Sequence, residues 1–286
     1  MTLRRWVCRA YETLWRGYWS VRGGRRVRAM GHELVLHPAT VFPTHRRLRL
    51  PRGGPKSEIV RYADFVQMHA CCQHCASLTH PPTVVDVGAH HGAYAVVLGK
   101  IAQERGGKVI AIEPNPASFS VLARNVALNG LEGTVALEQV AITQRSSTVR
   151  LALLGSESFV SEESQPDTLE VKGEPLSDVL RRHGVSHVDL LIIDVEGAEL
   201  PVLLSFPWAS VTLDRVFCEL HPNEWAHFGY SPAEFQAFLR ERDFRCVDMY
   251  FQEYDEVPAE RHIGPCCLLP ARNLGEAAAG QARHQA

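Results

Sequence analysis

A short segment around Gly88 constrains the fold of this chain more than any other part of the sequence. It begins with the β-branched run 83–85, a threonine and two valines, which is typical of a strand buried in a parallel sheet. Asp86, Gly88 and Gly92 follow, and glycines allow a backbone to turn sharply and to approach a ligand closely. The apolar segment 93–98 then begins a helix. A strand, a glycine turn and a helix start together predict a nucleotide-type site at the carboxyl edge of a sheet.

Strands and helices alternate through most of the chain. This alternation predicts an α/β fold, in which a three-layer, doubly wound and mostly parallel sheet has Rossmann-like connections. The last two strands follow each other without a full helix between them, which predicts an antiparallel edge strand. The expected strands are 83–87, 108–112, 134–139, 188–193, 211–220, 244–250 and 263–269, and the expected helices are 57–78, 93–104, 116–129, 176–183, a segment after Gly197, and 232–242.

Three parts differ in composition. Residues 1–56 carry twelve Arg and one Lys against two Glu, whereas the whole chain has a formal net charge of −2. We therefore expect a basic N-terminal arm at 1–56, a more acidic domain at 57–270 and a flexible tail at 271–286. Within the arm, residues 1–22 form a basic amphipathic pattern with Trp on the apolar side, which suits either peripheral membrane contact or docking on the domain. Residues 25–56 are expected to be irregular strands and loops.

An additional arm is expected inside the domain. Alternating apolar and polar residues in 147–154 predict a β-hairpin, and 155–167 are expected to be a flexible polar loop.

The eight cysteines lack the spacing of a disulfide framework, which favours a reducing compartment. The sequence has no run of about 18 apolar residues, which a membrane span would need, and it shows no clear secretory signal. The expected location is therefore cytoplasmic, with peripheral contact to the inner face of a membrane as a further expectation. His69, Cys71, Cys72, His74 and Cys75 resemble half of a zinc site, but without a second cluster of matching spacing they are interpreted as packed helix residues, and no metal ligands are assigned.

Acidic residues follow two further strands. Glu113 ends the second strand, 21 residues after Gly92, where a carboxylate can accept both ribose hydroxyls of a nucleoside. Asp194, Glu196 and Glu199 follow the apolar strand 188–193, which is expected to lie beside the first strand and so to face the same crevice. Acids suit a ligand with a cationic amino-acid end better than a pyrophosphate, which favours S-adenosylmethionine over NAD.

These segments resemble the FkbM family of methyltransferases. The resemblance spans about residues 82–222, and it implies a class I methyltransferase fold and O-methylation of a hydroxyl, often on a sugar or a secondary metabolite. Two departures are His90-His91 in the turn and Ile192 at a position where the family often has lysine. The matching motifs are Asp86-Val87-Gly88-Ala89 with Gly92, 112–116, Asn125 with 128–130, Val188 to Leu200, and 218–222.

The strand-end acids and the family resemblance together indicate candidate site residues. Glu196, Glu219 and His221 are the catalytic candidates, because an attacking alcohol must lose its proton to a nearby base. The cofactor-binding candidates are Asp86, Gly88, His90, Gly92, Glu113, Asn115, Ala141 and Asp194.

The sequence therefore predicts an S-adenosylmethionine-dependent O-methyltransferase that acts on a hydroxyl of a sugar, glycolipid or secondary metabolite. Two alternatives stay open at this point. One is an NAD-dependent Rossmann oxidoreductase, which the missing G-x-G-x-x-G pattern disfavours. The other is a non-catalytic, methyltransferase-like binding protein at a membrane, which intact Asp86, Glu113 and Asp194 disfavour. A nucleic-acid partner is not expected, because no recognised binding module is present.

Overall fold

The structure is a computed structural model. Within the part of the chain that it describes, no helix combines the length and the apolar character needed to cross a membrane. The expectations for residues 1–17, for the loop at 41–56 and for the tail after 273 lie outside this part. The described residues are 18–40, 57–154, 157–161, 168–248, 252–257 and 263–273.

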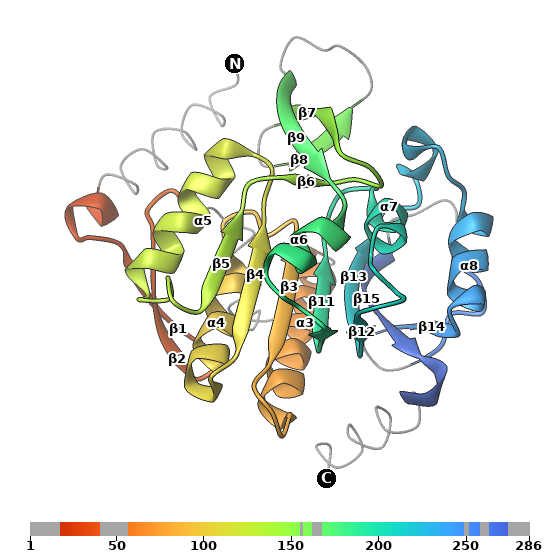
Figure 1. Cartoon of the computed structure of the whole chain (residues 1–286). Helices are drawn as coiled ribbons and strands as arrows, with labels where there is room; N and C mark the ends of the chain where they lie inside the picture. The colour runs from red at the N-terminus through yellow and green to blue at the C-terminus, as the bar shows by residue number, and fades with distance from the viewer. Residues whose placement is uncertain are drawn as a thin grey trace.

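A central sheet of seven strands has the order β14-β15-β13-β11-β3-β4-β5 (Figure 1). The neighbours from β13 to β5 are parallel, whereas β15 is antiparallel to both β13 and the edge strand β14. The predicted doubly wound, mostly parallel sheet is confirmed, and so is an antiparallel pairing at its end. The strands are β3 (Thr83–Val87), β4 (Lys108–Ile112), β5 (Val135–Glu138), β11 (Leu190–Ile193), β13 (Val216–Leu220), β14 (Phe244–Val247) and β15 (Ile263–Pro270).

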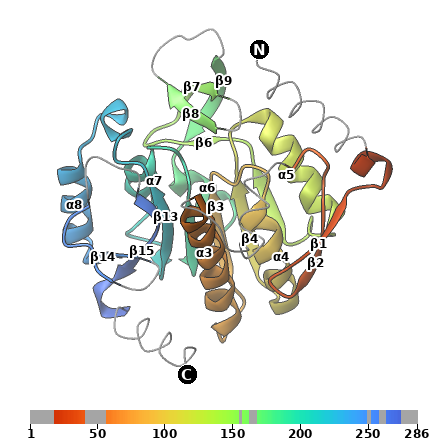
Figure 2. The ribbon, with the colours of Figure 1, turned by 180° about the vertical axis from the view of Figure 1, so that it is seen from behind.

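Helices cover both faces of this sheet and bury two apolar cores. Side chains of α3, α4 and α5 pack on one face with Val84 of β3, and side chains of α6, α7 and α8 pack on the other with Val85 and Val87. Figure 2 shows the face that carries α3 and α4. The helices are α3 (Ser57–Ser77), α4 (Ala93–Arg105), α5 (Pro116–Leu128), α6 (Leu176–Arg182), α7 (Glu199–Leu204) and α8 (Pro232–Glu241).

Local sequence signals set the helix ends. The side chain of Asn115 accepts a hydrogen bond from Ala117 N at the start of α5, where Pro116 occupies the first turn. Ser231 and Glu234 form both hydrogen bonds of a capping box at the start of α8. These helix starts are as the sequence predicts.

A regular hairpin, β1 (Arg25–Ala29) with β2 (His32–Leu36), occupies a segment that was expected to be irregular. Two side-chain amides, one in α5 and one at its C-cap, hold the hairpin and the residues after it. Asn129 accepts from Val35 N and donates to Val35 O, at 2.9 and 2.8 Å, and Asn125 accepts from His37 N at 2.6 Å. This part of the basic arm therefore packs on the domain.

Two predicted long strands are interrupted. The segment 188–193 divides at Asp189 into β10 (His187–Val188) and β11, and the segment 211–220 divides into β12 (Thr212–Leu213) and β13. The short strands β10 and β12 pair with each other in a separate two-stranded sheet. Apolar runs do not reveal such breaks, because the pairing partner decides where a ladder ends.

The additional arm is larger than the predicted hairpin. It is a four-stranded sheet of order β6-β9-β7-β8, built from β6 (Ala141–Ile142), β7 (Ser147–Leu154), β8 (Glu157–Ser161) and β9 (Thr168–Glu174). The prediction of a loop throughout 155–167 is wrong for β8. Figure 1 shows this arm at the top of the molecule, at the carboxyl ends of the core strands.

Candidate active site

Four acids at the carboxyl edge face the same side of the central sheet. Successive residues of a strand point to opposite faces. The residues next to each acid belong to the core on the α6–α8 face, so the acids themselves point to the α3–α5 face. The acids are Asp86, Glu113, Asp194 and Glu219, and the neighbours are Val87, Ile112, Ile193, Cys218 and Leu220.

The strand register places Gly88, Asp194 and Glu219 at one level. Ile193 is opposite Val87 of β3 and Cys218 of β13. One residue further along each strand, Asp194 therefore lies between Gly88 and Glu219. Gly88 has a φ of 87°, and a Cβ added there would lie 1.9 Å from the carbonyl oxygen of Asp194. A glycine is required at this point of close backbone approach.

Glu113 is a buried carboxylate that organises the turn after β3. One oxygen accepts a hydrogen bond from His90 N and the other from Asn115 N, both at 2.8 Å. Burial raises the pKa of Glu113 to about 7, to which the charge of Asp194 adds, although the two N–H donors oppose the shift. Each carboxylate oxygen can still accept a further hydrogen bond, so the group can bind two hydroxyls of a ligand.

Two non-glycine residues of the site have left-handed backbones. His90 has a φ of 48° and Glu196 a φ of 51°. Such conformations are uncommon outside glycine and are found more often at functional sites. The ring of His90 stacks on that of the buried His91, with centroids 3.8 Å apart, which fixes the direction of the turn.

His221 is held between two glutamates. Its Nδ1 lies 2.8 Å from Glu199 Oε1 and its Nε2 lies 3.1 Å from Glu196 Oε2. Glu199 is fully buried, and its other oxygen accepts hydrogen bonds from Trp225 Nε1 at 2.7 Å and Tyr230 OH at 3.1 Å. Glu199 therefore orients the imidazole, whereas the half-buried Glu196 lies on its opposite side.

The charge of His221 depends on these neighbours. Burial alone would lower the pKa of His221, but the hydrogen bond to Glu199 and the charges of Glu199, Glu196 and Asp194 raise it to about 9. At neutral pH the side chain is therefore an imidazolium. Ligand atoms of Asp194, Glu196 and His221 lie within 4.8 Å of one another, so this edge combines two carboxylates with a titratable imidazole.

The remaining predicted residues lie around this edge. Gly92 is the N-cap of α4 with a φ of 81°. Asp86 is almost completely buried one residue before the end of β3, opposite Ile192 and Ala111. Ala141 is buried in β6, where it pairs with Gly173 of the arm.

Glu199 belongs to the acidic motif after the strand 188–193, but the sequence predicts no role for it. No local pattern identifies it, because its side-chain partners lie 22 to 31 positions further along the chain.

The helical cysteines lie away from this chemistry. Cys71, Cys72 and Cys75 are buried in the core between α3 and the sheet. Burial raises the pKa of Cys72 and of Cys75 to about 12, so these thiols pack as small apolar groups, as the sequence predicts.

A doubly wound sheet with acids at the carboxyl ends of adjacent strands is typical of the Rossmann-like fold class, whose ligands bind at that edge. The methyltransferase FkbM domain matches residues 86–246, and the chain belongs to this family of methyltransferases. The methyltransferase sdnD of Sordaria araneosa is 30% identical over 223 residues, which are 64% of this chain and 82% of that protein. The oxidoreductase alternative is therefore not supported.

Solved structures similar to this chain include two methyltransferases of low identity. Methyltransferase FkbM from Methylobacillus flagellatus is 13% identical with a TM-score of 0.42, covering 79% of this chain and 58% of that one. The O-methyltransferase from Bacillus cereus in complex with SAH is 10% identical with a TM-score of 0.42, and the match covers 77% of this chain and 84% of that one.

Proposed function

We propose that this chain is an S-adenosylmethionine-dependent O-methyltransferase that acts on a hydroxyl of a sugar, glycolipid or secondary metabolite. The observation that carries the proposal is the common face of the strand-end carboxylates, with an imidazole held between two glutamates beside them. This donor set matches a ligand with ribose hydroxyls, an amino group and a sulfonium charge.

Residues on the β3–β4 side would bind the nucleoside. Glu113 would accept the ribose hydroxyls, and the His90 turn, which Glu113 fixes, would cover the ring. Gly88 lets the turn after β3 lie directly against the backbone of Asp194. Asp194 would hold the amino group of the methionine portion. Asp86, Gly92, Asn115 and Ala141 remain candidates for the surrounding contacts.

Residues on the β11–β13 side would act on the acceptor. When bound, the cofactor supplies an electrophilic methyl group on sulfur, so the main task of the protein is to align the acceptor oxygen. The acceptor proton has two receivers, the His221 imidazole and the Glu196 carboxylate, 3.1 Å apart. Because the pKa of His221 is about 9, transfer through His221 would become faster as the pH rises toward that value. Glu219, on the same face, is a further candidate.

The arm formed by β6 to β9 would lie beside the acceptor. It stands at the same edge as the strand-end acids (Figure 1). An ion-pair network ties its last strand to the domain: Arg182 of α6 contacts Glu174 at 2.6 Å and Glu138 of β5 at 2.8 Å. A firmly attached arm above the site suits a shaped acceptor such as a sugar ring.

Calorimetric titration tests the cofactor half of this proposal. S-adenosylhomocysteine and NADH are titrated separately into the full chain at pH 8. Saturable one-to-one binding of S-adenosylhomocysteine, with no binding of NADH, supports the proposal. Binding of NADH alone, or of neither ligand, contradicts it. A set of hydroxylated glycosides and polyketides, assayed with radiolabelled methyl donor, then identifies the acceptor.

A further inference from the structure

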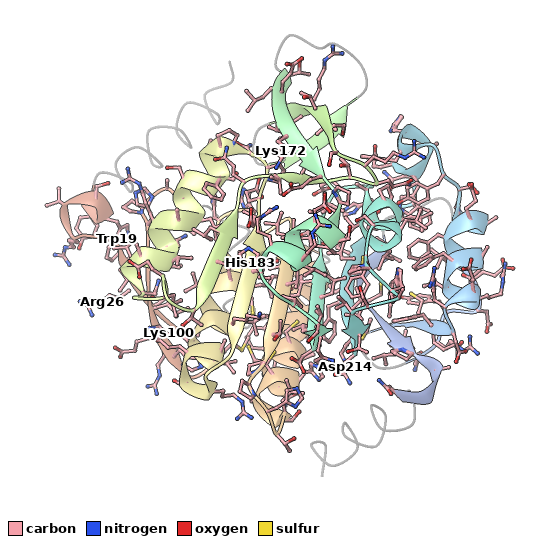
Figure 3. The ribbon with its side chains drawn as sticks, in the orientation of Figure 1. Trp19, Arg26, Lys100, Lys172, His183 and Asp214 are labelled. Carbon is pink, nitrogen blue, oxygen red and sulfur yellow. The ribbon has the colours of Figure 1, made fainter. Side chains whose placement is uncertain are left out.

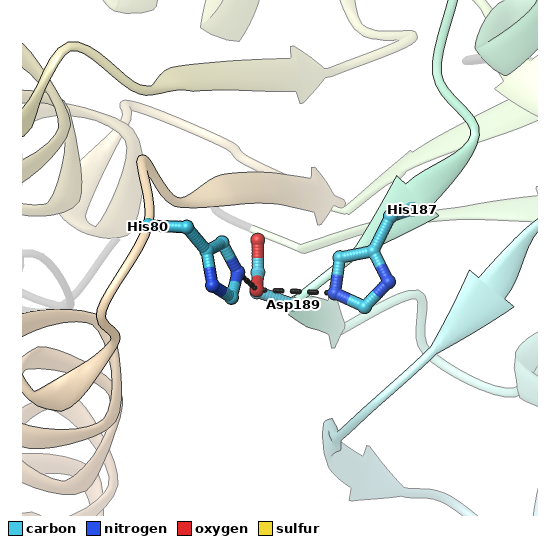
Figure 4. A group of neighbouring side chains, drawn as sticks. All are labelled: His80, His187 and Asp189. Carbon is cyan, nitrogen blue, oxygen red and sulfur yellow. Dashed lines mark hydrogen bonds and ion pairs between the residues drawn. The ribbon is translucent and has the colours of Figure 1, made fainter.

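A second cluster of titratable groups lies at the opposite edge of the sheet. His80 follows α3, His187 begins β10, and Asp189 interrupts the chain between β10 and β11. Both imidazoles point at one oxygen of the fully buried Asp189 (Figure 4). The distances to Asp189 Oδ1 are 2.6 Å from His80 Nε2 and 3.2 Å from His187 Nε2, and the three ligand atoms lie within 4.8 Å of one another.

This cluster is separate from the candidate active site. Asp189 N donates to the carbonyl of Thr83, the first residue of β3, at 3.0 Å. β3 is five residues long, so its two ends are about 13 Å apart. Figure 3 shows Asp214, which adjoins the cluster, near the lower end of the sheet, and Lys172 of the arm at the upper end. The cluster therefore lies at the amino edge, away from the strand-end acids.

The surroundings of the cluster leave three ligand atoms that face one another. Asp189 Oδ2 is occupied, because it accepts a hydrogen bond from Thr83 N at 2.7 Å, and Oδ1 is the oxygen that faces the histidines. Nδ1 of His187 is engaged by Thr212 Oγ1 at 2.5 Å, so Nε2 is the atom that faces Asp189. That Nε2 also lies 3.1 Å from Asp214 Oδ2. His187 Nε2 therefore faces carboxylate oxygens of both Asp189 and Asp214.

We propose that His80, His187 and Asp189 form a zinc-binding site. Two imidazole nitrogens and one carboxylate oxygen are ligands that zinc prefers, and water completes the tetrahedron in sites with three protein ligands. The hydrogen bond from His187 Nδ1–H to Thr212 would orient that ring, as partners of metal-bound histidines commonly do. Magnesium is disfavoured, because it prefers oxygen ligands.

The geometry allows an ion to enter. A tetrahedral ion with bonds of about 2.1 Å keeps its ligand atoms about 3.4 Å apart. The His187 distance already fits, whereas His80 must move outward by about 1 Å. His80 can do so, because its side chain is 50% exposed and lies in a connecting segment. The bound ion would tie the end of α3 to β10 and β11, and so stabilise the amino edge of the sheet.

The test uses the full chain with any affinity tag removed and with metal stripped by a chelator. Zinc chloride is titrated by calorimetry, and cobalt chloride is followed by its visible absorption. The variants are His80→Ala and His187→Ala. His227→Ala is the matched control, because His227 is an exposed histidine that also pairs with a carboxylate, Glu224, at 3.1 Å. His221→Ala reports binding at the other group of possible ligands within the described residues, which is Asp194, Glu196 and His221.

The proposal expects one-to-one zinc binding with micromolar or tighter affinity, and a zinc-dependent rise in Tm. His80→Ala is expected to weaken binding at least about tenfold and to abolish the rise in Tm, whereas His227→Ala and magnesium have no such effect. His80 is the decisive position, because its exposed side chain can be removed without unfolding the chain; a melt without metal confirms this. Zinc affinity that is absent in the wild type, unchanged in His80→Ala, or lost only in His221→Ala overturns the proposal. Affinity for S-adenosylhomocysteine is expected to stay unchanged in His80→Ala, so the result does not depend on the proposed function.

Discussion

Glu199 shows how one buried carboxylate sets the charge of its neighbour. Its oxygens accept hydrogen bonds from Gly197 N, Trp225 Nε1 and Tyr230 OH, and one of them lies against His221. A buried charge is retained only when such partners satisfy it. The imidazolium of His221 is the ionic partner among these groups.

Replacing Glu199 by Gln is expected to lower the pKa of His221. The substitution keeps the shape of the side chain but removes the negative charge, so the pKa should fall from about 9 by at least about one unit. A pH titration of the His221 ring by NMR measures the change. Glu241→Gln, at an exposed acid on α8, serves as the control and should leave the pKa as it is. Equal pKa values in Glu199→Gln and wild type would show that Glu199 does not set this charge.

The raised pKa of His221 also predicts how stability depends on pH. The folded-state pKa is about 9 and the ordinary value is 6.5, so the stabilisation is complete below about pH 6.5 and is lost as the pH rises through 9. Urea denaturation measures the free energy of unfolding of the wild type and of His221→Gln. The value of the wild type should approach that of the variant as the pH rises between these two values. A difference that stays constant from pH 6 to pH 10 would contradict the assignment.

Glu113→Ala is expected to weaken binding of S-adenosylhomocysteine by roughly a hundredfold, because two hydrogen bonds to a charged group are lost. In the wild type, affinity should rise as the pH increases through about 7, the pKa of Glu113, since the ionised form accepts both hydroxyls. Calorimetry from pH 6 to pH 8 measures both effects. Glu104→Ala, at an exposed acid paired with His32, is the control. Full affinity in Glu113→Ala would refute this position of the ribose.

At the scale of single elements, helix starts followed from the sequence and strand breaks did not. Asn115-Pro116 and Ser231-Pro232 signal helix starts through bonds within a few residues. The break at Asp189 depends on a hydrogen bond to Thr83, and β8 depends on its pairing with β7. Pairing between distant segments leaves no local signal.

Ser231→Ala is expected to destabilise the protein by about 1 kcal/mol, because the side chain that accepts from Glu234 N is lost. Urea denaturation measures the change in the free energy of unfolding. Ser210→Ala, at an exposed serine outside any helix, should change it by less than about 0.5 kcal/mol. Indistinguishable effects of the two substitutions would show that the capping box adds no stability.

At the scale of the whole molecule, the sheet separates two sets of polar groups. The carboxyl edge carries the strand-end acids and the arm, and the amino edge carries the proposed zinc ligands (Figures 1 and 4). The first set could be predicted, because Asp86, Glu113 and Asp194 each follow an apolar run directly. The second could not, because His80 and Asp189 are 109 positions apart in the chain and no local spacing links them.

The central claim is that carboxylates at adjacent strand ends surround one sulfonium nucleoside. A crystal structure of the chain with S-adenosylhomocysteine tests it most directly. The expected result is a ribose within hydrogen-bonding distance of Glu113 and an amino group beside Asp194, on the α3–α5 face. A ligand bound elsewhere, or a crevice at these strand ends filled by packed side chains, would contradict the account.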